Sequence, residues 1–252
     1  MAMQLRHDMV SLWQPRSFGA GLNAVVIGAG GGIGGAFAGA LEASPAVARL
    51  WRGARSGATE LTIDLEDEAS IAAAAAAAGA AGPLHLVIVA SGLLHDGPGL
   101  QPEKSWRALD GAAMAAAFRV NAIGPALVAK HFLPLLAKDR KAAFAVLSAR
   151  VGSIADNQLG GWHAYRASKA ALNMLVKTLS IELARRNSGA LCVALHPGTV
   201  DTALSQPFQR AVPDGGLFTP AQSARHLLDV LDGLSPRDSG NLYAWNGEAI
   251  PF

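Results

Sequence analysis

Short apolar runs alternate along the chain with longer stretches in which apolar residues recur at helical spacing. The runs end at turn-forming residues, and their length and β-branched content are typical of buried strands. They lie at 23–27, 47–54, 61–63, 84–89, 143–147, 190–195 and 242–244. The helical patterns between them lie at 34–43, 68–78, 112–136, 164–186 and 220–231. This alternation predicts an α/β fold, a doubly wound parallel sheet with helices on both faces.

Length and charge are consistent with a single domain of this kind. The chain has 252 residues, 51% of them hydrophobic, which is enough to bury one substantial core. We expect residues 1–22 to form a short N-terminal extension and residues 23–252 to form the domain. The formal charge of +2 is small and the basic residues are scattered, so neither nucleic acid nor an anionic membrane surface is expected as a partner. The tetrapeptide Lys-Asp-Arg-Lys at 138–141 is interpreted as a solvated turn.

Three further observations concern compartment, membrane and metal. Cys192 is the single cysteine, which excludes an intrachain disulfide and fits a reducing, cytoplasmic location. Its apolar neighbours predict a buried, inert thiol. No uninterrupted apolar run reaches the roughly 18 residues typical of a membrane span. No compact cluster of His, Cys and carboxylates has metal-ligand spacing, so no metal is expected.

Polar and glycine residues follow several of the predicted strands directly. In a parallel sheet the carboxyl ends of the strands meet at one edge, where ligands bind. The pattern therefore predicts a ligand site at that edge, formed by a glycine cluster after the first strand, Asp64-Leu65 after the third, Ser91-Gly92 after the fourth, Ser148 after the fifth and Pro197-Gly198 after the sixth.

The glycine cluster at 28–35 lies between the first strand and the first helix. Glycines there let the backbone approach a diphosphate closely, and the helix N-terminus points its amides at the anion. This arrangement predicts a Rossmann-like dinucleotide site. Two registers fit the sequence equally well, Gly28-Gly32-Gly34 or Gly30-Gly32-Gly35.

The residues after the second strand bear on which dinucleotide is bound. NAD-binding proteins usually have an acid there for the ribose hydroxyls, whereas a cation accommodates the extra phosphate of NADP. Here the segment reads Arg52-Gly53-Ala54-Arg55-Ser56, and the first acid is Glu60. This favours NADP(H) over NAD(H), with Arg55 as the first candidate for the phosphate and Arg52 as the second.

Tyr165 and Lys169 are the candidate catalytic pair. They are four residues apart in a predicted helix and therefore share one face. A nearby cation should lower the pKa of a tyrosine from its usual value of about 10. A tyrosine tuned in this way can exchange a proton with an alcohol or a ketone.

From residue 23 to its C-terminus the chain resembles the single-domain short-chain dehydrogenase/reductases. The match includes Gly28, Gly32 and Gly34, the adenine-contacting Asp64, Asn121 in Val-Asn-Ala, the Tyr165–Lys169 pair and the segment 197–202 beside the nicotinamide. The stretch 147–171 is most similar to the C-factor-like and sniffer-type carbonyl reductases. Patterns and resemblance together predict cofactor contacts from Gly28, Gly30, Gly32, Ile33, Gly34, Arg52, Arg55, Asp64, Leu65, Ser91, Gly92, Asn121, Tyr165, Lys169, Pro197, Gly198, Val200 and Thr202.

The resemblance implies a mechanism and an assembly. Tyr165 would donate the proton when a carbonyl compound is reduced to an alcohol. Lys169 would tune Tyr165 and hold the nicotinamide ribose, and Asn121 would anchor a water chain from Lys169 to solvent. The family commonly forms homodimers or homotetramers, which the Ala/Leu-rich helices beginning near 112 and 164 would suit.

The chain departs from the family pattern at three places. Ile27 replaces a threonine before the first glycine, and Val89-Ala90-Ser91-Gly92 replaces the usual Asn-Asn-Ala-Gly. Where relatives end the fifth strand with two serines, one of which polarises the substrate carbonyl, this chain has Ser148-Ala149. Ser148, slightly favoured for its place at a strand end, and Ser153 are the two candidates for that role. His163 and His196 are not favoured as acids or bases.

Two other functions remain open from the sequence. A cofactor-sensing or signalling protein with little turnover is the main alternative, supported by Ala149, and a nucleotide-sugar epimerase is less favoured because the length leaves little room for a second substrate domain. The substrate itself is expected to be a moderately apolar carbonyl compound. The apolar residues that suggest this are Leu204, Pro207, Phe208, Val212 and Leu217 in a lid-like segment at 202–218, with Leu93, Leu94 and Trp162 expected to line the pocket.

Overall fold

The computed structural model describes residues 12–57, 59–97, 99–211, 213 and 215–252. Within these residues eight strands form one sheet in the order β10-β9-β6-β5-β4-β1-β2-β3, parallel throughout except for β10. The strands are β1 (Leu22–Ile27), β2 (Val47–Ala54), β3 (Leu61–Thr62), β4 (Leu86–Val89), β5 (Ala142–Leu147), β6 (Ala190–His196), β9 (Leu242–Ala244) and β10 (Ala249–Ile250). The order reverses between β1 and β4, so the doubly wound fold predicted from the sequence is confirmed.

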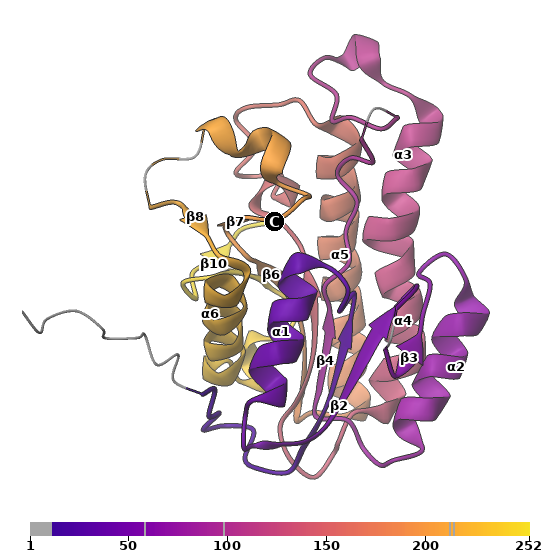
Figure 1. The fold of residues 1–252 in the computed structure, drawn as a ribbon, viewed down its shortest axis with the longest axis vertical. Coiled ribbons are helices and arrows are strands. Elements are labelled where there is room, and N and C mark those ends of the chain that lie inside the picture. Colours follow the sequence, from indigo (N-terminus) through magenta and orange to yellow (C-terminus); the bar gives the residue numbers. More distant parts are fainter. Residues whose placement is uncertain (1–11, 58, 98, 212, 214) are drawn as a thin grey trace, which may run out of the picture.

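Helices cover both faces of this sheet (Figure 1). On one face α1 (Gly32–Glu42) and α6 (Pro220–Gly233) pack on the apolar side chains that alternate strand residues direct toward them. On the other face lie α2 (Glu68–Gly79), α4 (Gly124–Phe132) and α5 (His163–Arg186). A separate pair of short strands, β7 (Thr199–Val200) and β8 (Leu217–Phe218), follows β6.

The chain before β1 is part of the same core. Trp13 and Phe18 are only 3% and 1% exposed and pack on the side of α1 and α6. The backbone amides of Arg16 and Ser17 donate to the carboxylate of Asp232 at the end of α6. Trp13 and Phe18 therefore attach the segment 12–21 to the core of the domain, while most of its other residues are exposed. Strand β1 begins at Leu22, and residues 1–11 of the expected extension lie outside the described residues.

The helix predicted over 112–136 is present as one helical stretch from Gly111 to Leu135, but a π-helical turn makes it irregular in the middle. The segment consists of α3 (Gly111–Phe118), a π-helical turn (Arg119–Ile123), α4 and a 3₁₀ turn (Leu133–Leu135). Pro125 provides the physical reason, since it has no N–H for the carbonyl of Asn121, four residues earlier, and its ring would clash with that carbonyl in a regular helix. The π turn contains Asn121, so the irregularity lies where the sequence predicts a functional residue.

By length and composition Gly111–Leu135 could also cross a membrane. This is weak evidence, because core helices of soluble proteins meet the same criteria, and α4 packs here against the sheet with Val128 and Phe132 fully buried.

Candidate active site

The glycine turn after β1 is closed by contacts that leave no room for side chains. Gly28 has φ +87°, and a Cβ there would lie 2.7 Å from Ser91 Oγ. A Cβ on Gly34 would lie 2.1 Å from the carbonyl oxygen of Gly28, and one on Gly32 would lie 2.7 Å from Thr202 Cγ2. At Gly30 the nearest atom would be 3.7 Å away, an ordinary contact, and at Gly35 it would be the carbonyl oxygen of Ala29 at 3.3 Å. The closest approaches therefore favour the Gly28-Gly32-Gly34 register.

The same turn has the features of an anion site. The helix α1 begins at Gly32, and its N-cap residue, Gly31, supplies no side-chain hydrogen bond. The first turn of α1 has no acidic residue that would repel an anion. The first amides of a helix need partners from outside it, and the diphosphate of a dinucleotide provides them. Gly30, Gly32 and Ile33 therefore fit the predicted cradle.

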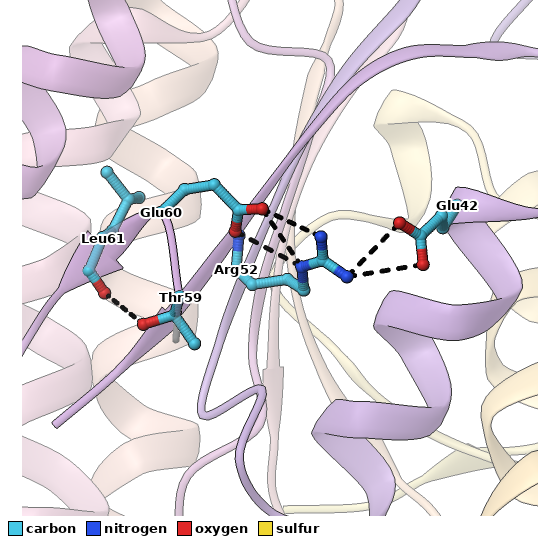
Figure 2. Close-up of polar contacts among 5 residues, drawn as sticks. All are labelled: Glu42, Arg52, Thr59, Glu60 and Leu61. Carbon is cyan, nitrogen blue, oxygen red and sulfur yellow. Dashed lines mark hydrogen bonds and ion pairs between the residues drawn. The ribbon is translucent and has the colours of Figure 1, made fainter. Parts of the chain in front are cut away.

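The end of β2 differs from the expectation for Arg52. Figure 2 shows its guanidinium between two carboxylates, 2.9 Å from Glu60 Oε1 and 3.3 Å from Glu42 Oε1. These contacts hold the pKa of Glu60 at about 2. Glu60 comes eight residues after Arg52 in the sequence, but it contacts the guanidinium because β3 pairs with β2. Arg55 is exposed and, among the described residues, forms no ion pair. It is two residues beyond Gly53, whose carbonyl oxygen accepts the amides of Gly28 and Ala29.

The remaining predicted cofactor residues lie on neighbouring elements. The carboxylate of the half-buried Asp64 accepts the amide of Glu66 at 3.0 Å, and Leu65 packs so closely on Gly124 that a Cβ there would lie 2.6 Å from Leu65 Cβ. Gly198 has φ +77°, and a Cβ on it would meet the ring of Phe218 at 2.7 Å. Val200 is buried within the β7–β8 pair.

The candidate catalytic pair lies on the first turns of α5. Lys169 Nζ is 5.8 Å from the centroid of the Tyr165 ring and donates to the carbonyl oxygen of Leu147 at 2.8 Å. Lys169 is 2% exposed. Gly92 completes this corner, since a Cβ on it would lie 3.7 Å from Lys169 Nζ and 3.6 Å from Asn121 Oδ1. The structure therefore brings Tyr165, Lys169, Asn121 and Gly92 together as the sequence predicts.

The expected lowering of the tyrosine pKa is wrong for this arrangement. Burial raises the pKa of Tyr165 to about 12 and lowers the pKa of Lys169 to about 7. Both shifts have one cause, since removal from water disfavours the charged form of either group. A lysine that is itself partly neutral near pH 7 also attracts a phenolate less. The structure thus contains a protonated phenol beside an ammonium that is readily deprotonated.

Asn121 holds two elements together through its side chain. Its amide accepts from the N–H of Leu93 at 2.7 Å, donates to the carbonyl oxygen of Leu93 at 2.7 Å and donates to Ser168 Oγ at 3.0 Å. It therefore clamps the loop after β4 against α5. Both amide hydrogens of the side chain are used in these bonds, and its oxygen accepts one.

The two candidate serines differ in their hydrogen bonds. Ser148 Oγ donates to Asn173 Oδ1 at 2.7 Å, and the amide nitrogen of Asn173 donates to the carbonyl oxygen of Gly152 at 3.3 Å, which fixes the orientation of that amide. Ser153 Oγ instead accepts the amide of Asp156 at 3.0 Å. Within the described part of the chain no acceptor is recorded for the Ser153 hydroxyl proton. Both serines are buried.

Sequence reasoning missed the polar residues Asn173 and Glu103 and the backbone conformation of Trp162. Asn173 shares the helix face of Tyr165 and Lys169 at four-residue spacing, so its position could have been found. Glu103 caps α5 from the loop after β4, and no local pattern signals it. Trp162 has left-handed backbone angles (φ 52°), and its ring centroid lies 6.3 Å from that of Tyr165 and 4.9 Å from that of Phe208.

The lid-like segment is described only in part. Phe208 lies against Trp162, and His95 Nε2 is 3.1 Å from the carbonyl oxygen of Leu204, so the segment contacts the loop after β4. Leu94 is buried, whereas Leu217 is 39% exposed. Val212 lies outside the described residues.

Burial shifts the pKa values of His196 and Cys192 away from the range useful for acid–base chemistry. Burial, together with the charge of Arg150, lowers the pKa of His196 to about 4, which leaves its imidazole neutral. Cys192 is fully buried and its thiol pKa is raised to about 12, in agreement with the predicted inert thiol.

Comparison with known proteins identifies the family. Residues 22–212 match the model of the short chain dehydrogenase family, and the chain belongs to that family. It is therefore an NAD(P)-dependent oxidoreductase with a Rossmann-like fold, and the resemblance predicted from the sequence is confirmed.

Among curated relatives, the chain is 41% identical over 150 residues to the C-signal protein of Myxococcus xanthus, covering 58% of this chain and 85% of that one. For two further relatives the aligned region spans only 60% and 56% of their length. Among solved structures, the NADPH-bound carbonyl reductase from chicken fatty liver has a TM-score of 0.78 at 29% identity, with 92% of this chain and 100% of that chain covered. The carbonyl reductase Sniffer of D. melanogaster, with a TM-score of 0.78, the same coverage and 22% identity, shows the same fold.

Proposed function

We propose that the protein is an NADP(H)-dependent reductase that interconverts a ketone or aldehyde and an alcohol, with Tyr165 as the proton donor. The observation that carries this proposal is the pair of the half-buried Tyr165 and the buried Lys169 near a glycine turn that fits a dinucleotide. When bound, the nicotinamide cofactor supplies or accepts the hydride.

The protein's residues contribute the proton and the orientation. With a pKa of about 12, Tyr165 carries its proton throughout the neutral range and can give it to the oxygen of a carbonyl compound that is being reduced. Lys169, with a pKa near 7, can gain and lose a proton close to physiological pH, which suits it to return a proton to Tyr165. The free hydroxyl proton of Ser153 makes it the better candidate to polarise the carbonyl, ahead of Ser148.

The preference for NADP(H) is supported by Arg55. It is exposed at the end of β2, close to the cradle, whereas the two carboxylates on Arg52 leave Arg52 no free charge for a phosphate. The chicken carbonyl reductase, at 29% identity, has NADPH bound. Asp64, Leu65, Ser91, Gly92, Pro197, Gly198, Val200 and Thr202 complete the proposed cofactor contacts.

Replacement of Tyr165 by phenylalanine tests the proton-donor role. Tyr165→Phe deletes the transferable proton and leaves the ring and the glycine turn in place. We expect turnover to fall by at least about 100-fold, the range typical for loss of a general acid, with NADPH affinity nearly unchanged. NADPH oxidation with 4-nitrobenzaldehyde and 2,3-hexanedione measures turnover, and fluorescence titration measures affinity. Near-normal turnover in this variant would refute the assignment.

Two arginine variants test the cofactor preference. Arg55→Ala should bring the dissociation constants of NADPH and NADH closer together, because it removes the free cation at the end of β2. Arg52→Ala is the matched control, since it breaks the ion pairs to Glu42 and Glu60 and should lower thermal stability while leaving the preference intact. If Arg52→Ala alone removed the preference, the phosphate would bind at Arg52.

A signalling function is the second candidate, because the chain is 41% identical over 150 residues to a protein named C-signal. The two candidates predict different turnover. A protein that binds NADPH tightly but oxidises none of it with a broad set of aldehydes, ketones and diketones would favour the signalling function.

We further propose a homodimer formed through α4 and α5. Ile123, Met174 and Ile181 are exposed by 49%, 65% and 50%. A groove of about 410 Å³ between the two helices is lined by apolar residues that include Leu133 and Leu179 and by charged residues that include Lys130 and Glu182. Light scattering at micromolar concentration tests this, and a monomer would contradict it.

A further inference from the structure

Glu103 lies in the loop after β4 and is bonded to the start of the catalytic helix. Its carboxylate accepts the amide of Ala164 through both oxygens, at 3.3 and 3.2 Å. Its backbone carbonyl oxygen accepts the amide of Trp162 at 2.5 Å. One residue thus satisfies two of the backbone donors at the beginning of α5, the helix that carries Tyr165 and Lys169.

The helix α5 has no cap of its own. Its N-cap residue is Trp162, which forms no side-chain cap bond, and the first turn contains no acidic residue. Trp162 is also the only described non-glycine residue with a positive φ, a conformation that costs free energy unless its neighbours impose it. Glu103 supplies both missing elements, the acceptor and the negative charge that a helix N-terminus favours.

The environment of Glu103 shows that this contact is its main interaction. The residue is 6% exposed, and among the residues that the structure describes none forms an ion pair with it. Burying a carboxylate without a counter-ion is costly, and the helix N-terminus is the compensating partner that the structure provides. Serine, threonine, aspartate or asparagine usually caps a helix locally, but Trp162 has no acceptor for this, so the acceptor comes from another part of the chain.

The position of Tyr165 indicates what the contact achieves. Tyr165 directly follows Ala164, and the ring of Trp162 lies 6.3 Å from the ring of Tyr165, centroid to centroid. Both residues bonded to Glu103 are therefore neighbours of the proposed proton donor. The loop after β4 is also clamped to α5 near its start, where Asn121 bonds to Leu93 and to Ser168.

We propose that Glu103 is a positioning residue, which fixes the first turn of α5 and thereby aims the hydroxyl of Tyr165 at the substrate oxygen. This inference rests on the proposed role of Tyr165. A misplacement of about 1 Å in a reacting group can cost on the order of 100-fold in rate, so a loosened first turn should be visible in catalysis.

Two substitutions at Glu103 and one control test the proposal. Glu103→Ala removes both carboxylate acceptors, whereas Glu103→Gln keeps one oxygen that can accept from Ala164. Asp67→Ala is the control, because Asp67 caps α2 with a comparable bond to the amide of Ala69, 3.0 Å long, and has no place in the proposed chemistry. The measurements are kcat and KM for 4-nitrobenzaldehyde, the NADPH dissociation constant, the solvent deuterium isotope effect on kcat, and Tm.

Glu103→Ala should lower kcat by about 10- to 100-fold and raise the isotope effect, because proton donation becomes slower, while the NADPH dissociation constant changes by less than about threefold. Glu103→Gln should recover most of kcat. Asp67→Ala should lower Tm with kcat unchanged. If Glu103→Ala lowers Tm like Asp67→Ala and leaves kcat and the isotope effect unchanged, Glu103 is only a structural cap and the proposal is wrong. An active Tyr165→Phe enzyme would instead overturn the proposed function.

Discussion

Ser148 and Ser153 differ in what their hydroxyl protons do. Ser148 gives its proton to Asn173, whose amide is in turn fixed by Gly152. Ser153 accepts a backbone amide and so keeps its own proton for another acceptor. Gly152 makes the position of Ser153 possible, since a Cβ on Gly152 would lie 2.7 Å from Lys169 Cβ. The backbone thus passes close beside α5 and carries Ser153 with it.

Alanine substitutions at the two serines should therefore have different effects. Ser153→Ala should lower kcat by about 100-fold, the usual cost of one donor to a developing oxyanion, with NADPH binding unchanged. Ser148→Ala should mainly lower the free energy of unfolding, by about 1 kcal/mol, because it leaves Asn173 Oδ1 buried without its donor. Steady-state kinetics and urea unfolding of both variants check this, and the reverse ranking in kcat would assign the role to Ser148.

The sequence identifies the site residues whose roles depend on near neighbours in the chain. Tyr165, Lys169 and the three close-packed glycines are found this way, because each role depends on neighbours within a turn or two. Glu103 is not, since its partner is 61 residues away and is a backbone amide that any residue would offer. The pKa of Tyr165 also escapes local reasoning, because burial decides it and burial depends on the whole fold.

Among the elements, strands and regular helices follow from the apolar pattern, but the joints between elements do not. The pattern places the sheet strands β1 to β6 and β9 within about two residues, whereas β10 and the π-helical turn around Asn121 are absent from it. Gly124-Pro125 is the visible signal for that turn. The segment 138–141 shows the converse, since its charges suggest a solvated turn yet Lys141 lies half-buried against the end of α6.

Lys141 caps α6 and links it to the segment before β1. Its ammonium donates to the carbonyl oxygens of Leu231 and Asp232 at 2.7 and 3.0 Å and to Ser17 Oγ at 2.7 Å, and it lies 4.3 Å from the centroid of the Phe18 ring. Burial lowers the pKa of Lys141 to about 8, so the folded state disfavours its charge, but its amine hydrogens still pair with these carbonyl oxygens. Lys141→Met should lower the free energy of unfolding by about 1–3 kcal/mol, because it leaves those acceptors without their donor.

Urea unfolding with Lys138→Met as the control measures this effect, since Lys138 is the exposed lysine of the same segment. Equal stabilities of the two variants would show that the cap contributes nothing.

For the whole molecule, the sheet order explains why distant parts of the sequence form one site. The strands β1, β4, β5 and β6 are consecutive neighbours at the centre of the sheet, so their carboxyl ends bring the glycine turn, Ser91-Gly92, Ser148 and Pro197-Gly198 to one edge. The helix α5 runs along this group and adds Tyr165 and Lys169 (Figure 1). Burial in such a fold shifts the pKa values of ionisable groups, so the free energy of unfolding should depend on pH.

The free energy of unfolding should therefore increase with pH just above neutrality. Burial lowers the pKa of Lys169 from 10.5 to about 7 and that of Lys141 from 10.5 to about 8. Between these values and 10.5 the unfolded chain binds more protons than the folded chain, so the free energy of unfolding increases with pH. The thiol of Cys192 acts in the opposite direction above pH 9, since its pKa rises from 9.0 to about 12 and only the unfolded chain ionises there.

We expect urea midpoints to increase from pH 7 to 9 and to increase less steeply, or fall, above that. Lys169→Met should flatten the increase between pH 7 and 9, whereas Lys104→Met, at an exposed lysine, should leave it unchanged. A wild-type midpoint that stays constant from pH 7 to 9 would mean that Lys169 keeps an ordinary pKa in the folded protein, and the proposed proton return from Lys169 to Tyr165 would lose its basis.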